Sequence, residues 1–221
     1  MTALERTLES ILSGPRGFVD RRSTVRTWLL AVGLGGGFYG AVMGSFGGLT
    51  ADRAVQIVYS AAKVPMLLMA TTLIATPSFF VLNSLMGLRN DFGAAFRAVL
   101  GTQAAIAVIL AALAPYTAIW YLSTTDYHEA TTFNALMFAI ASFAAQWQLR
   151  RRYRDLEAKN HRHAILRRIW IVLYAFVGIQ MGWFLRPFIG DPARAPTFLR
   201  SEAFGNAYVV VADTVWDALT R

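Results

Sequence analysis

The sequence predicts an all-α fold: a polytopic integral membrane helical bundle with about five transmembrane helices and amphipathic helices at both ends. Hydrophobic residues make up 56% of the 221 residues, whereas charged residues make up only 15%. The mean hydropathy is +0.43. The charges are clustered between long uncharged runs, which is the pattern expected of membrane spans joined by loops.

Residues 28–49 form the first predicted span, an uncharged stretch with glycines at helical spacing. One row of glycines repeats every four residues and contains Gly36, Gly40, Gly44 and Gly48. A pair of glycines, Gly33 and Gly37, lies beside this row. Small residues in such a row let another helix backbone approach closely within lipid. We expect this ridge either to pack against a helix of the same subunit or to form the seam of a homo-oligomer.

Four further spans are predicted from apolar runs at about residues 64–87, 96–120, 132–149 and 169–185. Pro77 lies in the middle of the second span, where it should kink or break the helix. Asn83 follows in the same span. Its amide could contribute to a pore or binding site, or simply satisfy backbone groups that the kink releases.

Residues 150–168, between the fourth and fifth spans, form the most basic segment of the chain. Its cations are Arg150, Arg151, Arg152, Arg154, Lys159, Arg162, Arg167 and Arg168. Three kinds of partner are open for this segment. It could attract anionic lipids, at about 1 kcal/mol for each Lys or Arg near the surface, or dock an acidic protein, or bind a nucleotide or oligonucleotide.

The charges also predict an orientation. With five spans, 15 of the 21 Lys and Arg residues lie on the side of the amino terminus. The positive-inside rule then places the amino terminus in the cytoplasm and the carboxyl terminus outside, in a bacterial inner (plasma) membrane. Residues 1–27 are then a cytoplasmic amphipathic segment, residues 28–186 the five-span domain, and residues 187–221 an extracytoplasmic segment.

The extracytoplasmic segment begins with a proline-rich stretch, for which we expect no regular structure, and ends with an amphipathic helix over residues 203–219. Asp213 and Asp217 lie on the polar face of this helix. Around the axis of an oligomer they would form an acidic ring, which draws cations to a pore mouth.

Nothing in the sequence predicts catalysis. The chain has no cysteine, and no nucleophile with a base and an orienting partner can be identified. Three histidines, two of them among arginines, do not form a metal site. Gly35, Gly37 and Gly40 match a dinucleotide-binding fingerprint, but they lie inside an apolar span rather than between a strand and a helix. We therefore expect no enzymatic activity, no metal and no cofactor.

Two stretches of the chain, KVPMLLMATTLIATPSFFVLNSLMG and GWFLRPFIGDPARAPTFLR, resemble a group of small bacterial polytopic membrane proteins of unsettled function. The predicted layout, five spans with a cytoplasmic amino terminus, is similar to that of the Yip1 superfamily of membrane-trafficking proteins. Neither resemblance implies catalytic residues.

The leading functional hypothesis is an oligomeric pore- or channel-forming protein that is gated through an anionic ligand or partner at the basic segment. Nucleotide-gated membrane effectors of antiphage systems are an analogy for this arrangement. The alternative is a non-conducting membrane scaffold, or a trafficking protein of Yip1 type. A small-molecule transporter that uses the second span is the third hypothesis.

Overall fold

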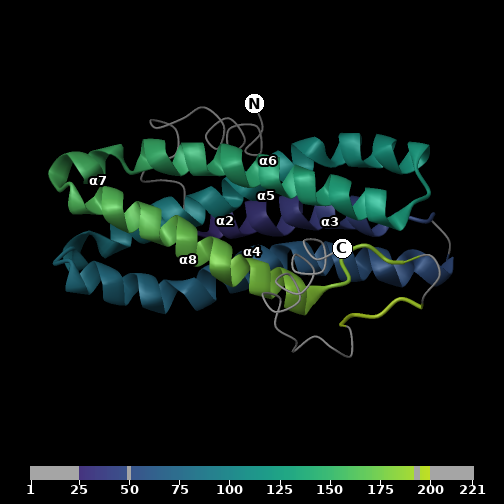
Figure 1. The fold of residues 1–221 in the computed structure, drawn as a ribbon, viewed down its shortest axis with the longest axis horizontal. Helices are drawn as coiled ribbons and strands as arrows, with labels where there is room; N and C mark the ends of the chain where they lie inside the picture. The colour runs from purple at the N-terminus through teal and green to yellow at the C-terminus, as the bar shows by residue number, and fades with distance from the viewer. Residues whose placement is uncertain (1–24, 49–50, 192–194, 200–221) are drawn as a thin grey trace, which may run out of the picture.

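The computed structural model describes residues 25–48, 51–191 and 195–199, and within these residues the regular structure is entirely helical. The elements in order are α2 (Val25–Ala31), the π-helical turn η1 (Val32–Gly36), α3 (Gly37–Gly44), α4 (Ala51–Leu85), the 3-10 turn η2 (Arg89–Asp91), α5 (Phe92–Ser123), α6 (Tyr127–Arg152), α7 (Arg154–Lys159) and α8 (Arg162–Leu185). The long helices lie side by side along the long axis of the molecule (Figure 1). The two predicted amphipathic helices, with Asp213 and Asp217, lie outside the described residues.

The glycine ridge packs within the chain, against α4. An added Cβ would lie 2.9 Å from the Ala61 Cα at Gly40 and 2.8 Å from the Ile57 Cα at Gly44, so neither position has room for a side chain. Gly36 packs in the same way against Pro65, at 3.4 Å. The partner of these three glycines is therefore α4 of the same subunit rather than a second copy. At Gly37 an added Cβ would make an ordinary contact, 3.6 Å from the Ala61 carbonyl oxygen, and at Gly33 and Gly48 it would meet nothing within 4 Å.

α4 is longer than the predicted second span, and the prolines within it do not interrupt the helix. The sequence predicts a short polar link around Asp52 and Arg53 and a span that begins at about residue 64, with Lys63 at its mouth. The helix instead begins already at Ala51 and continues through both Pro65 and Pro77 to Leu85. Pro77 therefore does not break the helix. Hydroxyl groups next to it bond to backbone carbonyls one turn earlier: Thr76 Oγ1 donates to the Thr72 carbonyl at 2.6 Å. Asn83 Nδ2 does the same to the Phe79 carbonyl at 2.8 Å.

α5 is the central helix of the bundle. It is the most deeply buried of the apolar helices, and almost every side chain from Ala98 to Leu110 is inaccessible to solvent. Small residues dominate this stretch, so neighbouring helices can approach it closely. Gln103 is buried there as well, and its Oε1 accepts a hydrogen bond of 2.7 Å from the Tyr174 hydroxyl of α8.

α6 runs antiparallel to α5 and packs along it. Asp126 caps its first turn by accepting bonds from the backbone N–H groups of His128, at 2.6 Å, and Glu129, at 3.0 Å. These two bonds, that from Glu129 foremost, hold the pKa of the Asp126 carboxyl below its usual value. At the other end of the bundle, α7 turns the chain into α8, which returns along α4.

Within the described residues, four helices are long and apolar enough to cross a membrane: Val25–Gly44, Arg53–Leu85, Arg89–Ser123 and Arg162–Leu185. They correspond to the first, second, third and fifth predicted spans. α6, the predicted fourth span, is long enough but does not belong to this apolar set, because it carries more polar and charged residues. The protein is accordingly an all-helical protein with the composition of a membrane protein.

Replacing Gly40 with alanine should destabilise the bundle, because the added Cβ meets the Ser60 carbonyl and the Ala61 Cα of α4. The expected loss in the free energy of unfolding is about 1–3 kcal/mol, the usual cost of overpacking. Unfolding of the purified protein in detergent would measure it. Gly33→Ala is the matched control: it adds the same methyl group in open space and should be neutral or stabilising. Equal effects of the two substitutions would contradict this account of the ridge.

Candidate functional site

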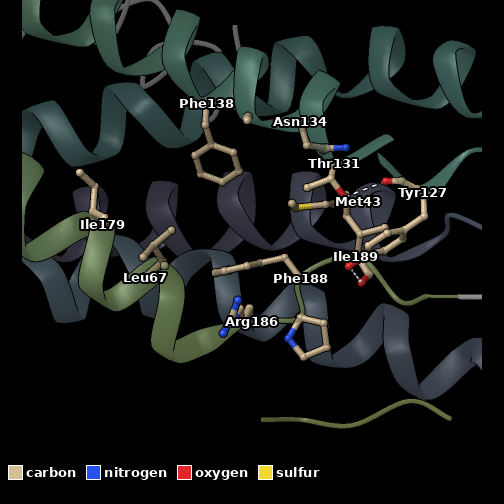
Figure 2. A pocket seen from close by; sticks show the side chains of 13 residues that line it. Met43, Leu67, Tyr127, Thr131, Asn134, Phe138, Ile179, Arg186, Phe188 and Ile189 are labelled. Atoms are coloured by element: carbon tan, nitrogen blue, oxygen red, sulfur yellow. Dashed lines mark hydrogen bonds between the residues drawn. The ribbon is translucent and has the colours of Figure 1, made fainter. Parts of the chain in front are cut away.

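A cavity of about 590 Å³ lies between α3, α4, α6, α8 and the chain that follows α8. Most of its lining is apolar; the lining residues are Met43, Leu67, Tyr127, Thr131, Asn134, Ala135, Phe138, Ile179, Gly182, Arg186, Pro187, Phe188 and Ile189. Figure 2 shows side chains from these separate segments around the same space. Arg186 is the one charged residue in this lining, and the hydroxyl and amide groups come mainly from the first turns of α6.

The polar edge of the cavity belongs to a buried hydrogen-bond network centred on Asn134. Its Oδ1 accepts a bond of 2.9 Å from the Tyr39 hydroxyl of α3, and its Nδ2 donates to the Tyr121 hydroxyl of α5 at 2.6 Å. The same Nδ2 donates to the Ala130 carbonyl at 2.7 Å. Thr117 Oγ1 adds a bond of 3.4 Å to the Tyr39 hydroxyl. Since Asn134 joins three helices, the position of the polar edge is fixed by the bundle itself.

One wall of the cavity is the segment of residues 187–190, here called the strap, which follows α8 and folds back onto α4. Its first peptide bond, between Arg186 and Pro187, is cis. The strap has no regular secondary structure, as predicted for the proline-rich stretch. Phe188 and Ile189 line the cavity, and the Ile189 carbonyl accepts a bond of 3.4 Å from the Tyr127 hydroxyl of α6.

A row of polar side chains on α4 satisfies the carbonyl groups of the strap. Lys63 Nζ donates to the Pro187 carbonyl at 2.6 Å, and Arg53 Nη2 donates to the Gly190 carbonyl at 2.9 Å. Between them, the Phe188 carbonyl accepts from Ser60 Oγ and, at 3.3 Å, from Gln56 Nε2. Lys63 is completely buried, and its ammonium lies 5.0 Å from the ring centre of Phe198. A buried cation is tolerated here because carbonyl oxygen and an aromatic face replace water.

The sequence analysis missed this row, because it expected Arg53 in a short polar link and Lys63 only at the mouth of the second span. Their positions did contain a signal: residues 53, 56, 60 and 63 are three, four and three apart, which puts all four on one face of a helix. The strap itself could not have been identified as the partner from spacing, since the bonded residues lie 124 to 137 positions apart.

The close approach of the strap also explains one glycine. A Cβ added at Gly190 would lie 2.6 Å from Gln56 Cγ and 3.0 Å from Arg53 Nη2.

Beside the strap, the guanidinium of Arg186 lies over the ring of Trp183, with 3.0 Å from Cζ to the ring centre. The positive charge at the cavity is therefore held against an aromatic face.

The predicted basic segment divides into two groups of four. In one group the cations bind within the chain: Arg167 pairs with Glu157 at 2.8 Å, Lys159 with Asp91 at 3.7 Å, Arg162 donates to the Met86 carbonyl at 3.0 Å, and Arg152 donates to Gln148 at 2.9 Å. Burial lowers the pKa of Arg152 to about 10. The other group, Arg150, Arg151, Arg154 and Arg168, is exposed.

Two further predicted site residues, Pro77 and Asn83, do not line the cavity. Pro77 is exposed on α4, and Asn83 is buried with its amide bonded to its own helix, which favours a backbone-satisfying role over a pore-lining one. In the part of the chain that the structure describes, no group of three His, Cys, Asp or Glu side chains is placed to hold a metal ion.

Comparison with protein-family models, curated proteins and solved structures finds no match for this chain.

Replacing Lys63 with methionine should release the strap, because the Pro187 carbonyl loses its buried donor while the side chain keeps most of its apolar length. The expected loss in the free energy of unfolding is about 1–3 kcal/mol. Unfolding in detergent, combined with limited proteolysis near residue 190, would detect both effects. Lys159→Met is the control, since this side chain is 66% exposed and its ion pair should contribute under about 1 kcal/mol.

Removing the Tyr39 hydroxyl in Tyr39→Phe should destabilise the bundle by about 1–3 kcal/mol, because a buried acceptor on Asn134 loses its donor. The same substitution at Tyr116, whose side chain is 63% exposed on α5, should have little effect. A thermal melt of the two variants in detergent tests the comparison; similar melting temperatures would show that the network contributes no stability.

Proposed function

We propose that this protein is a multi-pass membrane protein that binds an amphipathic small molecule with one acidic group in the cavity between α3, α4, α6, α8 and the strap. The observation that carries the proposal is the cavity itself. Its volume of about 590 Å³ is within the range of small-molecule sites, and such sites are mostly apolar with a few fixed polar groups.

The distribution of side chains favours a lipid-like ligand. Leu67, Phe138 and Ile179 offer contacts to an apolar body from three different helices. The polar end would lie near the Tyr127 and Thr131 hydroxyl groups, and the positive charge of Arg186 favours a carboxylate or phosphate over a neutral head group. Because the Asn134 network and the bonded strap hold the lining in place, little ordering is required when a ligand enters.

The course of the chain supports five membrane spans. α5 ends and α6 begins at the end of the bundle that contains the cavity, whereas α8 begins at the opposite end, beside η2. If α5 and α8 both cross the membrane, α6 must cross it as well. Its 26 residues extend about 39 Å, which is longer than the hydrocarbon core. We infer a cytoplasmic basic end and an extracytoplasmic cavity and strap, in the inner membrane of a bacterium.

This proposal places the third hypothesis from the sequence, a transporter or carrier, ahead of the other two. The oligomeric pore remains a prediction, but α5 occupies the centre of the single bundle and α4 covers the main glycine row. A pore would therefore have to form between copies of the chain. The non-conducting scaffold also remains a prediction, since nothing in the geometry of the described residues specifically favours it.

A cavity-filling variant tests the proposal. Wild-type protein in detergent should bind a fluorescent long-chain fatty acid saturably and with one site per chain. Gly182→Phe should weaken that binding at least about tenfold, because Gly182 lines the cavity and a Cβ added there meets no atom within 4 Å. Fluorescence titration gives both dissociation constants.

Gly93→Phe is the matched control, since Gly93 is exposed, has the same free space and lies outside the cavity. It should bind the fatty acid as the wild type does. Absence of saturable binding in the wild type, or equal binding by Gly182→Phe, would overturn the proposal. Ion flux through reconstituted vesicles, in the absence of fatty-acid binding, would favour the pore instead.

A further inference from the structure

Four of the exposed arginines at the basic end of the bundle lie on three neighbouring elements. Arg150 and Arg151 end α6, Arg154 begins α7, and Arg168 lies in the second turn of α8. These three elements meet at one end of the molecule (Figure 1). The acids Asp91 and Glu157 of this end pair with Lys159 and Arg167, so they do not neutralise the exposed group.

Two members of this cluster, Arg151 and Arg168, each continue an exposed apolar row of their helix. On α8, Arg168 precedes Val172, Phe176 and Ile179 at helical spacing, and all of them are exposed. On α6, Arg151 follows Phe143 and Trp147, which are 82% and 59% exposed. The guanidinium of Arg151 lies 5.8 Å from the ring centre of Trp147, an arrangement common where a helix leaves the hydrocarbon region.

We propose that Arg150, Arg151, Arg154 and Arg168 form a binding site for the head group of an anionic phospholipid, whose acyl chains lie along the exposed rows of α6 and α8. Guanidinium groups bind phosphate oxygens bidentately, and the apolar rows supply a surface that only a lipid tail would cover favourably. A soluble polyanion or an acidic protein would use the charges but would not cover the exposed side chains of Phe143 and Val172.

The proposed site includes only four of the eight cations of the basic segment. Lys159, Arg162 and Arg167 are engaged in bonds that join α7 and α8 to each other, to η2 and to the turn after α4. Arg152 donates to Gln148 of its own helix, α6. Asp155 is exposed next to Arg154 and reduces the local positive charge without cancelling it. Arg168 lies near the start of α8, whereas the cavity is lined by Ile179, Gly182 and the chain that follows α8, so the head-group site is separate from the cavity even though the apolar row reaches Ile179.

Native mass spectrometry of the full chain in a neutral detergent, with phosphatidylglycerol and phosphatidylcholine as probes, tests the site. We expect phosphatidylglycerol to bind more tightly, and Arg168→Gln to weaken its binding roughly fivefold, the effect of one arginine at an anionic surface. The affinity should also fall as salt is raised. Arg168→Lys, which keeps the charge, should restore part of the affinity.

Arg89→Gln is the matched control, because Arg89 is exposed at the same end but lies in the turn η2, outside the apolar rows of α6 and α8. It should change the affinity less than twofold. The proposal is overturned if the two glutamine variants weaken binding equally, if phosphatidylcholine binds as well as phosphatidylglycerol, or if inorganic phosphate or an oligonucleotide displaces the lipid at comparable concentration. A melting curve for each variant confirms that a lost affinity is not lost folding.

Discussion

The close contact between α3 and α4 determines where the other parts of the bundle can lie. Gly40 and Gly44 bring the backbone of α3 against backbone atoms of Ser60, Ala61 and Ile57, with the Ser60 hydroxyl also beside Gly44. In lipid, such contact gives dispersion energy that apolar side chains alone do not provide, because their alternative surroundings are equally apolar. The contact also sets the rotation of α4. With Ala61 turned toward α3, the row containing Ser60 and Lys63 is directed to the strap, and the cavity lies beside that row.

The polar groups of the bundle are arranged in small, mutually satisfied sets rather than dispersed singly. The Asn134 amide forms hydrogen bonds with two tyrosine hydroxyl groups, and the Gln103 amide forms one with a third. Each set joins different helices, so each adds specificity to a core in which alanine and glycine offer few distinctive shapes. The cavity lies where two such arrangements, the Asn134 network and the strap, meet an apolar opening between α6 and α8. This explains how a largely apolar site can still have a defined polar edge.

The sequence predicts the helices well and their partners poorly, for a physical reason. A long, mainly apolar run such as residues 96–120 predicts a helix within lipid because no other local structure satisfies its backbone, and α5 occupies that region. A glycine row predicts close approach but does not identify the neighbour, since any helix backbone fits it. Polar residues at the end of a span are ambiguous in the same way. Lys63 resembles a loop residue until the Pro187 carbonyl, 124 positions later, is placed beside it.

The long separation between the two sides of the strap contact has a consequence for the order of assembly. Arg53, Gln56, Ser60 and Lys63 are synthesised long before Pro187 and Gly190, the groups that eventually accept their hydrogen bonds. Until α8 and the strap have been made, this face of α4 is a polar strip without its native partners, and water, lipid head groups or the insertion machinery must supply its hydrogen bonds. Arrival of the strap then completes the bundle. α4, which is made early, therefore carries the hydrogen-bonding surface for the strap, which is made after α8.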